Sequence, residues 1–380
     1  MSKKNNPNIL KYFEKNNLVE LLKEILEKDN FEEFNLSIGA IDVGYGNTKY
    51  TSGINEKGDL ELDMFPSVAP LAPQQSMAGG LLGKRNVKII DIEGTKYEIG
   101  PDAELTANNS GTVKNLNENY IFSEQYKALF LGALAYMNKE HYDYIVLGLP
   151  VNYLNNTEKL QEMFKGEHKV SESLNCTIDN VIVVPQPLGA FYDIAINQEK
   201  YFDLIEETNL VIDPGFLTYD FLTTYGLKPI ESRSDALNGG MSRVLHTIAN
   251  SISDTIDKPY KDYASIDRAI RKPKKVKNQE TGKFEPMRIV KIAGKEYDLL
   301  PHIKNSTPTI ENAINHMTNV VQTYDDLNNI ILAGGADSIF EKKIREHIGR
   351  EILKAENAIY SNVRGFWLIG VLEAMKILVK

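Results

Sequence analysis

The chain contains the stretch Ala40-Ile41-Asp42-Val43-Gly44-Tyr45-Gly46-Asn47-Thr48-Lys49-Tyr50, which predicts two strands joined by a tight turn. The apolar run over residues 37–43 predicts a buried strand, and residues 47–52 predict a returning strand. Gly44, Gly46 and Asn47 tolerate positive φ, so the turn can direct several backbone N–H groups into one concavity, an arrangement that binds phosphate oxygens. Asp42 ends the first strand and is placed to hold a divalent cation through water, and Lys49 can neutralise a phosphate.

A second stretch, Leu210-Val211-Ile212-Asp213-Pro214-Gly215-Phe216-Leu217-Thr218-Tyr219, repeats this pattern of apolar strand, aspartate and glycine turn. A third strand is expected after it, at residues 230–233. The two aspartates, Asp42 and Asp213, lie in different halves of the chain, and a repeat on this scale predicts two similar domains rather than a solenoid of short units. We therefore expect the two hairpins to face each other across a cleft and to hold one nucleoside triphosphate from both sides.

Composition limits the class of protein. The chain has 380 residues, of which 42% are hydrophobic, enough for two or three domains. Its net charge of −9 argues against a protein that binds nucleic acid over its whole surface, so contact with DNA would need a local patch or an adaptor protein. The single cysteine, Cys176, excludes a disulfide framework. Apolar runs fall short of the ~20 residues that span a bilayer, so we expect a cytoplasmic protein.

Two α/β domains are expected from the order of the strands and helices, each with a smaller subdomain. The first takes in residues 36–205 together with a C-terminal helix at 362–380, and contains a β-rich insertion at about 59–115. The second spans residues 206–361 and contains a subdomain at about 250–305. The cleft between the two domains is where the hairpins would meet.

Three other segments leave alternatives open. Residues 1–35 carry apolar side chains on one helical face, so this extension either packs on the body of the protein or docks on a neighbouring subunit. Residues 77–83 form an exposed loop, either a contact element or an ordinary variable loop. The basic run from Arg268 to Lys277 is interpreted as a solvated loop rather than a binding patch, because it is short and broken by Pro273.

Further motifs lie where strands run into helices. Gln186 follows an apolar strand and opens a helix, a place where the functional side chains of α/β folds gather. Gly239 and Gly240 precede another helix, where a glycine pair permits close approach of a ligand and supplies free N–H groups. Gly334 and Gly335 follow a buried strand, which again predicts a cradle for a phosphate or a nucleoside.

Taken in order, these motifs resemble the nucleotide-binding signature of the actin superfamily, from about residue 37 to 380. The two hairpins resemble its two phosphate motifs, the segment around Gln186 its first connecting motif, and Leu332-Ala333-Gly334-Gly335 its adenosine motif. The second hairpin departs from the family in carrying the bulky Phe216 and Leu217. Three segments resemble the plasmid-segregation branch of ParM and StbA, namely Val43-Gly44-Tyr45-Gly46-Asn47-Thr48-Lys49, Phe65-Pro66-Ser67 and Val184-Pro185-Gln186-Pro187-Leu188-Gly189.

The resemblance implies an actin-like, ribonuclease-H-like fold and a nucleotide-driven polymerising ATPase, or GTPase, of the bacterial cytoplasm. Its dynamic filaments would segregate plasmid DNA through a small DNA-binding, ParR-like adaptor on the plasmid centromere. Copies of the chain itself and this adaptor are the expected partners, with no direct binding of DNA and no binding of a membrane. Mg²⁺ is the expected cofactor, and ATP or GTP the expected substrate.

Roles for individual residues follow from the same resemblance. Asp42 and Asp213 would hold Mg²⁺ mainly through water and Gln186 would orient the attacking water, so these three form the expected catalytic group. Because glutamine is a poor base, hydrolysis in a single subunit is expected to be slow and to rise on assembly. The residues expected to bind the nucleotide are Gly44, Tyr45, Gly46, Asn47, Lys49, Gly215, Phe216, Leu217, Gly239, Gly240, Gly334 and Gly335.

Two other functions fit the same cleft: a small-molecule kinase of the sugar or acetate type, and a nucleotide sensor that does not polymerise. A kinase needs an acidic base near the γ-phosphate. The only nearby acids, Asp193 and Asp220, are interpreted as helix and strand surface. A chaperone of this fold would need a further substrate domain, for which the chain has no residues left.

Overall fold

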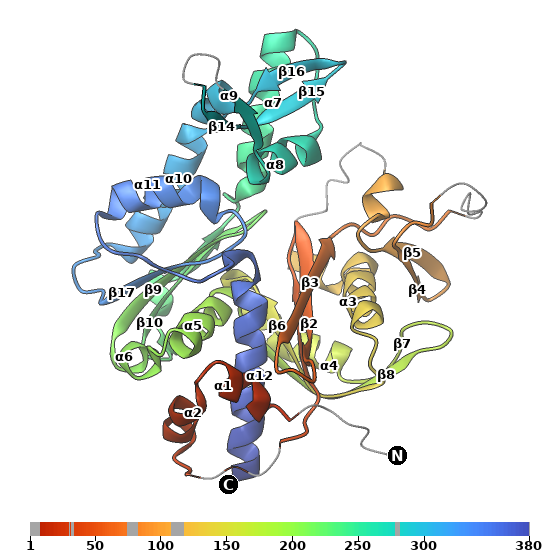
Figure 1. Ribbon diagram of the computed structural model, residues 1–380, viewed down its shortest axis with the longest axis vertical. Coiled ribbons are helices and arrows are strands. Elements are labelled where there is room, and N and C mark those ends of the chain that lie inside the picture. Colours follow the sequence, from red (N-terminus) through yellow and green to blue (C-terminus); the bar gives the residue numbers. More distant parts are fainter. Residues whose placement is uncertain are drawn as a thin grey trace.

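Two mixed sheets form the body of the molecule, one in each lobe, with two crossing helices between them (Figure 1). A smaller group of elements extends from each lobe (Figure 1). The computed structural model describes residues 8–29, 31, 34–73, 83–107, 118–277 and 282–379.

The first sheet has the strand order β3-β2-β1-β6-β8-β7. The predicted hairpin lies within it, because β1 pairs antiparallel with β2, and β6 and β8 continue in parallel on the other side of β1. All residues of β1 are buried, as expected for a strand with both faces covered. The strands are β1 Ile38–Val43, β2 Asn47–Ile54, β3 Leu60–Pro66, β6 His141–Leu149, β7 Gly166–Lys169 and β8 Asn175–Pro185.

The second sheet has the order β11-β10-β9-β17-β18, with β12 also beside β10. It repeats the plan of the first sheet: an antiparallel hairpin, β9 and β10, followed by two strands that continue in parallel. The repeat predicted from the two aspartate stretches is therefore present in the fold. The strands are β9 Thr208–Pro214, β10 Tyr219–Tyr225, β11 Lys228–Pro229, β12 Asp235–Leu237, β17 Asn329–Leu332 and β18 Leu353–Lys354.

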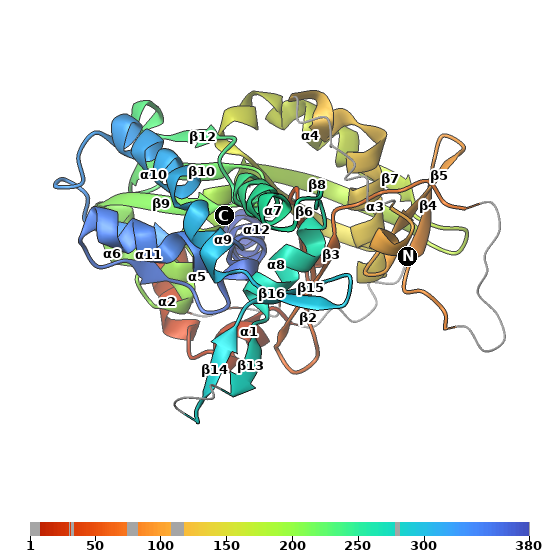
Figure 2. The ribbon, with the colours of Figure 1, turned by 90° about the horizontal axis from the view of Figure 1, so that it is seen from above.

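Helices α5 and α12 cross between the two sheets, and Figure 2 shows α12 at the centre of the molecule. Buried side chains of both helices pack with residues of β1, β9 and β17, so this layer belongs to both lobes. Separate cores lie between the first sheet and α3, and between the second sheet and α7, α10 and α11. The helices are α3 Glu124–Met137, α4 Thr157–Phe164, α5 Gln186–Asn197, α6 Tyr201–Glu206, α7 Met241–Ile256, α8 Tyr263–Arg271, α9 Leu300–Asn305, α10 Thr307–Val321, α11 Asp337–Ile348 and α12 Ser361–Val379.

The smaller elements of the two lobes are hairpins and short helices. Glu93-Gly94 and Ala293-Gly294 form the turns of β4–β5 and β15–β16, and all four residues have positive φ. The loop expected at 77–83 lies, up to residue 82, outside the described residues. The strands here are β4 Lys88–Ile92, β5 Thr95–Ile99, β13 Lys274–Lys277, β14 Phe284–Met287, β15 Ile289–Ile292 and β16 Lys295–Asp298.

The prediction of a strand at residues 230–233 is wrong. Residues Glu231–Arg233 form a short 3₁₀ helix, η4, between the brief strands β11 and β12. Pro229 has no N–H group to donate in a sheet, and side chains supply some of the hydrogen bonds in this segment. The N–H group of Thr223 donates to Ser234 Oγ at 2.9 Å, and Thr223 Oγ1 donates to the carbonyl of Arg233 at 2.6 Å.

The N-terminal extension packs on the body of its own chain. It forms two short helices, α1 Leu10–Lys15 and α2 Val19–Leu26, whose apolar side chains join the core around α5 and α12. Lys15 also forms an ion pair with Asp59 in the turn between β2 and β3. Among the described residues, the helices are too short or too polar to cross a bilayer.

Candidate functional site

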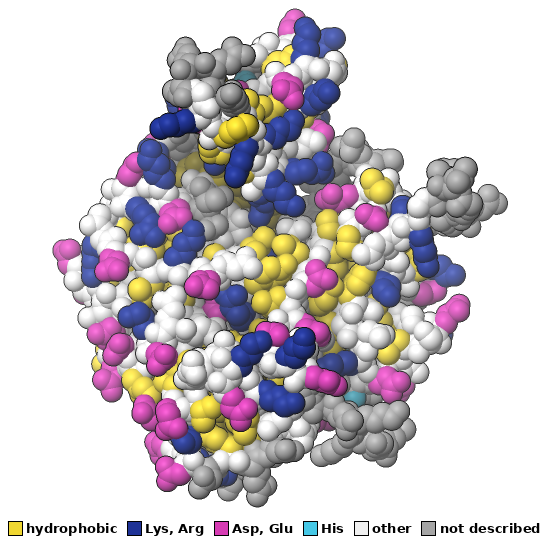
Figure 3. All heavy atoms as spheres, in the orientation of Figure 1, with side chains coloured by type: hydrophobic (Ala, Val, Ile, Leu, Met, Phe, Trp, Pro, Cys, Tyr) yellow, Lys and Arg dark blue, Asp and Glu magenta, His cyan; other side chains and the backbone are white. Residues whose placement is uncertain are grey.

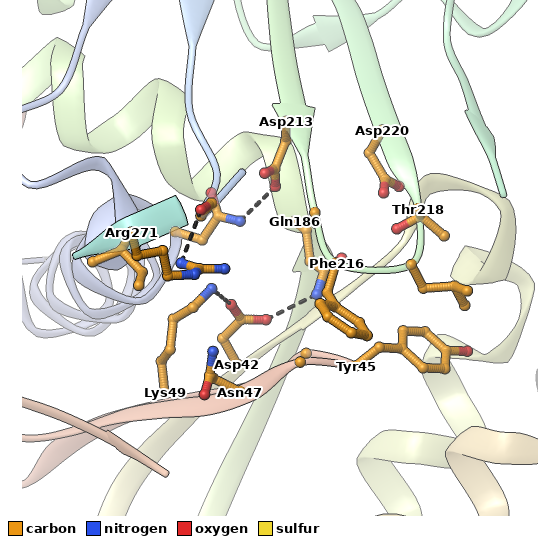
Figure 4. Close-up of a pocket in the computed structure, with 17 residues that line it drawn as sticks. Asp42, Tyr45, Asn47, Lys49, Gln186, Asp213, Phe216, Thr218, Asp220 and Arg271 are labelled. Carbon is orange, nitrogen blue, oxygen red and sulfur yellow. Dashed lines mark hydrogen bonds and ion pairs between the residues drawn. The ribbon is translucent and has the colours of Figure 1, made fainter. Parts of the chain in front are cut away.

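A pocket lies between the turns of the two hairpins, one from each sheet (Figure 4). In the first hairpin Asp42 pairs across the strands with Lys49, and at the corresponding place in the second Asp213 pairs with Asp220. The pocket is lined by Asp42, Gly44, Tyr45, Gly46, Asn47, Lys49, Gln186, Asp213, Gly215, Phe216, Leu217, Thr218, Asp220, Arg271, Gly335, Ile359 and Asn362. Most of the residues singled out in the sequence are thus brought together.

Asp42 is buried and held by two side chains. Lys49 Nζ lies 2.9 Å from its Oδ2, and Gln186 Nε2 donates a 2.8 Å hydrogen bond to its Oδ1. Gln186 is the first residue of α5, directly after β8 ends, so the predicted strand-to-helix junction carries it into the pocket. Because both oxygens of Asp42 already accept from protein donors, this carboxylate is suited to contact a cation through water rather than directly.

Asp213 is buried on the opposite side of the pocket, and Asn362 Nδ2 donates a 2.6 Å hydrogen bond to its Oδ2. Burial raises the pKa of Asp213 to about 6; the Asn362 hydrogen bond and the Lys49 charge oppose this rise, and the negative charge of Asp42 adds to it. Asn362 Oδ1 is buried, with no hydrogen-bond partner among the described residues. A buried acceptor without a partner, next to the carboxylate of Asp213, is a place for a water molecule or a ligand donor.

Asp220 and Asp193 are both buried, so their interpretation as surface residues is wrong. Burial, followed by the charge of Asp213, raises the pKa of Asp220 to about 7. Its Oδ1 accepts the backbone N–H of Val151 at 3.2 Å, across the cleft in the first lobe. Asp193 lies on the face of α5 that α12 covers. The segments that bury Asp193 and Asp220 come from distant parts of the chain, so the local sequence does not show that these two aspartates are buried.

The tips of the two hairpins touch each other. A Cβ atom at Gly46 would lie 2.9 Å from Phe216 Cβ, so a larger residue at 46 would collide with the second turn. The bulky Phe216 therefore fills the space over the first turn, next to Tyr45 (Figure 4). The N–H groups of Gly44 and Gly215 donate 2.9 Å hydrogen bonds within their own turns, so these two N–H groups are engaged.

Gly239 and Gly240 do not line the pocket, and the expectation that they supply free N–H groups there is wrong. The N–H groups of Gly240, Met241 and Ser242 donate hydrogen bonds of 2.6–3.0 Å to carbonyl groups of the second turn. A Cβ atom at Gly240 would lie 2.6 Å from the carbonyl oxygen of Gly215. The start of α7 thus supports the turn from behind instead of facing a ligand.

Gly335 lines the pocket, whereas Gly334 lies behind it. Gly334 has φ +85°, and a Cβ atom there would overlap Asp213 Oδ1, so only glycine lets this turn approach the aspartate. The carbonyl of Gly335 accepts a 3.0 Å hydrogen bond from Arg271 Nη1. Of the four glycines predicted outside the hairpins, the structure places Gly335 alone in the pocket lining.

Arg271 is the clearest residue that the sequence interpretation missed. It ends α8, and its Nε donates to both oxygens of Asp267 at 2.8–2.9 Å, which directs the guanidinium towards Gly335. The spacing of four residues between Asp267 and Arg271 on one helix was the available signal. The interpretation of the run from Arg268 to Lys277 as a solvated loop is wrong in part: the run lies mostly in α8 and β13, and Arg271 reaches the pocket, although Lys272, Lys274 and Lys275 are exposed. Basic side chains gather on the upper part of the molecule in Figure 3.

Two family models match the chain. One describes the N-terminal domain of actin-like proteins and matches residues 40–189; the other describes the C-terminal region of archaeal MreB-like actin homologues and matches residues 211–346. The chain belongs to the actin superfamily. Each match contains one of the two hairpins, so the pocket of this actin-like protein lies between the two matched regions. A comparison with curated protein sequences finds no match.

Solved structures of actin homologues share this fold. An archaeal actin homologue, also solved in complex with ADP, has a TM-score of 0.68 at 17% identity, covering 88% of this chain and 99% of its own. A 15-stranded ParM filament from Clostridium botulinum gives 0.68 at 22%, covering 89% and 99%. The actin-like protein Alp7A gives 0.66 at 16%, covering 90% and 98%. At such identities the likeness shows the fold alone.

Proposed function

We propose that this actin-like protein binds and hydrolyses ATP or GTP and assembles with copies of itself into a filament. The observation that carries the proposal is the pocket, in which Asp42, Lys49, Gln186 and Asp213 meet although they come from both lobes. The ADP complex of the archaeal homologue supports a nucleotide as the ligand, and the ParM filament supports self-assembly.

The pocket residues fit a Mg²⁺ ion held mainly through water, and we assign Asp42 and Asp213 to hold it. Both oxygens of Asp42 are occupied by protein donors, and burial disfavours the charged form of Asp213. A nearby cation would favour ionisation of Asp213. Oxygen ligands and retained water suit Mg²⁺. When bound, the ion would neutralise charge on the phosphates.

Phosphate oxygens would accept hydrogen bonds from backbone N–H groups of residues 45–47 and 216–217, and Lys49 would add a point charge. Gln186 would orient the attacking water, and its hydrogen bond to Asp42 fixes the amide in the pocket. Positioning and charge neutralisation account for most of phosphoryl-transfer catalysis, and glutamine is a poor base. Hydrolysis in a lone subunit should therefore be slow, and a contact between subunits that rotates the lobes would accelerate it.

Light scattering and phosphate release, followed together after mixing the protein with Mg²⁺ and ATP or GTP, test the proposal. Scattering should rise above a critical protein concentration and decay as phosphate appears, and negative-stain images of the same sample should show filaments. Phosphate release that stays linear in protein concentration, without any scattering, would refute polymerisation.

The biological role that we propose is segregation of plasmid DNA in the bacterial cytoplasm through a ParR-like adaptor. The resemblance to ParM supports this role, and the net charge of −9 agrees with contact to DNA through an adaptor. We also propose two domains, residues 36–205 with 362–380 and residues 206–361. Co-sedimentation of filaments with centromere DNA should require the adaptor; DNA that sediments without it would contradict this arrangement.

A small-molecule kinase is the second candidate, and Asp220 is the observation that favours it. An acid in the pocket with a pKa raised to about 7 can accept a proton near neutral pH. However, its Oδ1 already accepts the N–H of Val151, which orients the carboxylate towards the backbone of the first lobe. An assay with ATP and a series of sugars and small acids tests this candidate. A phosphorylated product that forms in proportion to the nucleotide consumed would establish the kinase.

A further inference from the structure

The N-terminal segment packs where α5 and α12 cross, and it precedes the family match that begins at residue 40. The ring of Tyr12 lies edge-on to that of Trp367 in α12, with centroids 4.9 Å apart. Phe13 is buried beside it. The turn between β2 and β3 also holds α1, since a Cβ atom at Gly58 would lie 2.6 Å from the carbonyl oxygen of Lys11.

Tyr12 begins a chain of hydrogen bonds that leads inward from this segment. Its hydroxyl donates to Asn197 Oδ1 at 2.7 Å, and Asn197 Nδ2 donates to Asp193 Oδ1 at 2.8 Å. Burial raises the pKa of Tyr12 to about 12, so the phenol keeps its proton and remains a donor at neutral pH. The N-terminal segment is therefore tied to a buried carboxylate of α5.

The same carboxylate holds the first turn of α12. Asp193 Oδ2 accepts from Ser361 Oγ at 2.7 Å and from Arg364 Nη2 at 2.6 Å. Asn362 lies between these two residues, and its amide donates to Asp213 Oδ2 in the pocket. Ser361, Asn362, Asp193 and Asp213 are all buried. Two sets of hydrogen bonds, joined by the covalent backbone of residues 361–364, thus lead from Tyr12 to the second phosphate hairpin.

The packing at this crossing leaves little room for α5 and α12 to move independently. A Cβ atom at Gly189 would lie 2.5 Å from the carbonyl oxygen of Asn362, and one at Gly365 would lie 2.9 Å from Gly189 Cα. Close-packed backbones transmit small displacements because they cannot absorb them. A change at Asp193 therefore moves the first turn of α12, and Asn362 with it.

We propose that Tyr12 is a positioning residue for Asp213, and that the docked N-terminal segment regulates how tightly the pocket holds its nucleotide. This inference rests on the proposed function of the pocket. With the segment docked, Asn197 and Asp193 are fixed, and Asn362 holds Asp213 in place. When the hydroxyl of Tyr12 is lost or the segment lifts away, Asp213 gains freedom and the nucleotide leaves faster.

The variant Tyr12→Phe tests the inference, because it removes the hydroxyl and keeps the ring against Trp367. Tyr97→Phe is the matched control: Tyr97 is 4% exposed against 6% for Tyr12, and its hydroxyl also donates to one side chain, Glu124 Oε2, at 2.6 Å. Dissociation of a fluorescent ATP or GTP analogue is measured in both variants, together with thermal unfolding. We expect Tyr12→Phe to raise the dissociation rate about 2- to 30-fold, the range for coupling between distant sites.

Equal dissociation rates in Tyr12→Phe and Tyr97→Phe would overturn the inference, even if both variants were less stable. A second variant, Asn197→Ala, breaks the next link, and its effect on dissociation should not add to that of Tyr12→Phe. Additive effects would mean that the two residues act separately.

Hydrogen exchange without nucleotide separates this inference from the proposed function. If no form of the protein binds ATP or GTP, the proposed function fails. The inference is then tested by amide exchange alone: exchange in residues 208–219 and 361–365 should be faster in Tyr12→Phe than in Tyr97→Phe. Unchanged exchange in both segments would refute it.

Discussion

Replacing Gly365 with alanine should destabilise the protein at the crossing of α5 and α12. The added Cβ atom would lie 2.9 Å from Gly189 Cα and would overlap the adjacent carbonyl oxygen. These are backbone atoms, so no side chain can swing aside. Overpacking of this kind costs about 3 kcal/mol, and the better helix propensity of alanine returns about 1 kcal/mol. The net loss of unfolding free energy is about 2 kcal/mol, close to a 30-fold larger unfolded fraction.

Gly370→Ala is the control in the same helix. Its Cβ atom would meet side-chain methyl groups, Ile38 Cγ2 and Val146 Cγ2, each at 2.9 Å. These contacts involve side chains instead of backbone and are less close than the overlap at Gly365, so the cost is smaller, and the gain in helix propensity offsets part of it. We expect its unfolding free energy to stay within about 1 kcal/mol of that of the wild type.

Urea denaturation measures both variants, with the fluorescence of the single tryptophan, Trp367, as the probe. This side chain is buried two residues from Gly365, so it reports on the helix under test. Gly365→Ala should unfold at a clearly lower urea concentration than Gly370→Ala. Equal midpoints, or a more stable Gly365→Ala, would show that α5 and α12 are not in backbone contact there.

Three further outcomes follow from the pocket. Gln186→Ala should lower phosphate release about 100-fold by misplacing the attacking water, with filament assembly intact in light scattering; release at the wild-type rate would show that Gln186 has no such role. Because the pKa of Asp220 is raised from 3.8 to about 7, the folded protein binds more protons than the unfolded chain in this window, so stability falls as pH rises from 4 to 7, by at most about 4 kcal/mol. The urea midpoint of Asp220→Asn should change less with pH over this range than that of the wild type, and it should be higher than that of the wild type at pH 8. A pH profile equal to that of the wild type would contradict the raised pKa of Asp220. Arg271→Ala, which removes the hydrogen bond to the Gly335 carbonyl, should weaken nucleotide binding about 10-fold and leave inorganic pyrophosphate binding nearly unchanged, as calorimetry can check; equal losses would place Arg271 at the phosphates.

Local sequence patterns were enough to predict the hairpins that build the pocket. Strand periodicity, the aspartate that ends each first strand and the glycines of each turn depend on neighbouring residues only. The place of Gln186 between a strand and a helix is equally local. For this reason Asp42, Lys49, Gln186 and Asp213 could be chosen before the fold was known, and the pocket contains all four.

Contacts between distant segments decided the rest. Arg271 faces the pocket because Asp267 directs it to Gly335, and Gly240 faces away because α7 supports the second turn. Asn362 reaches Asp213 because α12 returns to cross α5. A side chain's burial and partners depend on which remote segment packs against it, and no pattern within a few residues carries that information. Local patterns therefore predict the two hairpins, whereas the residues that surround them depend on how distant segments pack.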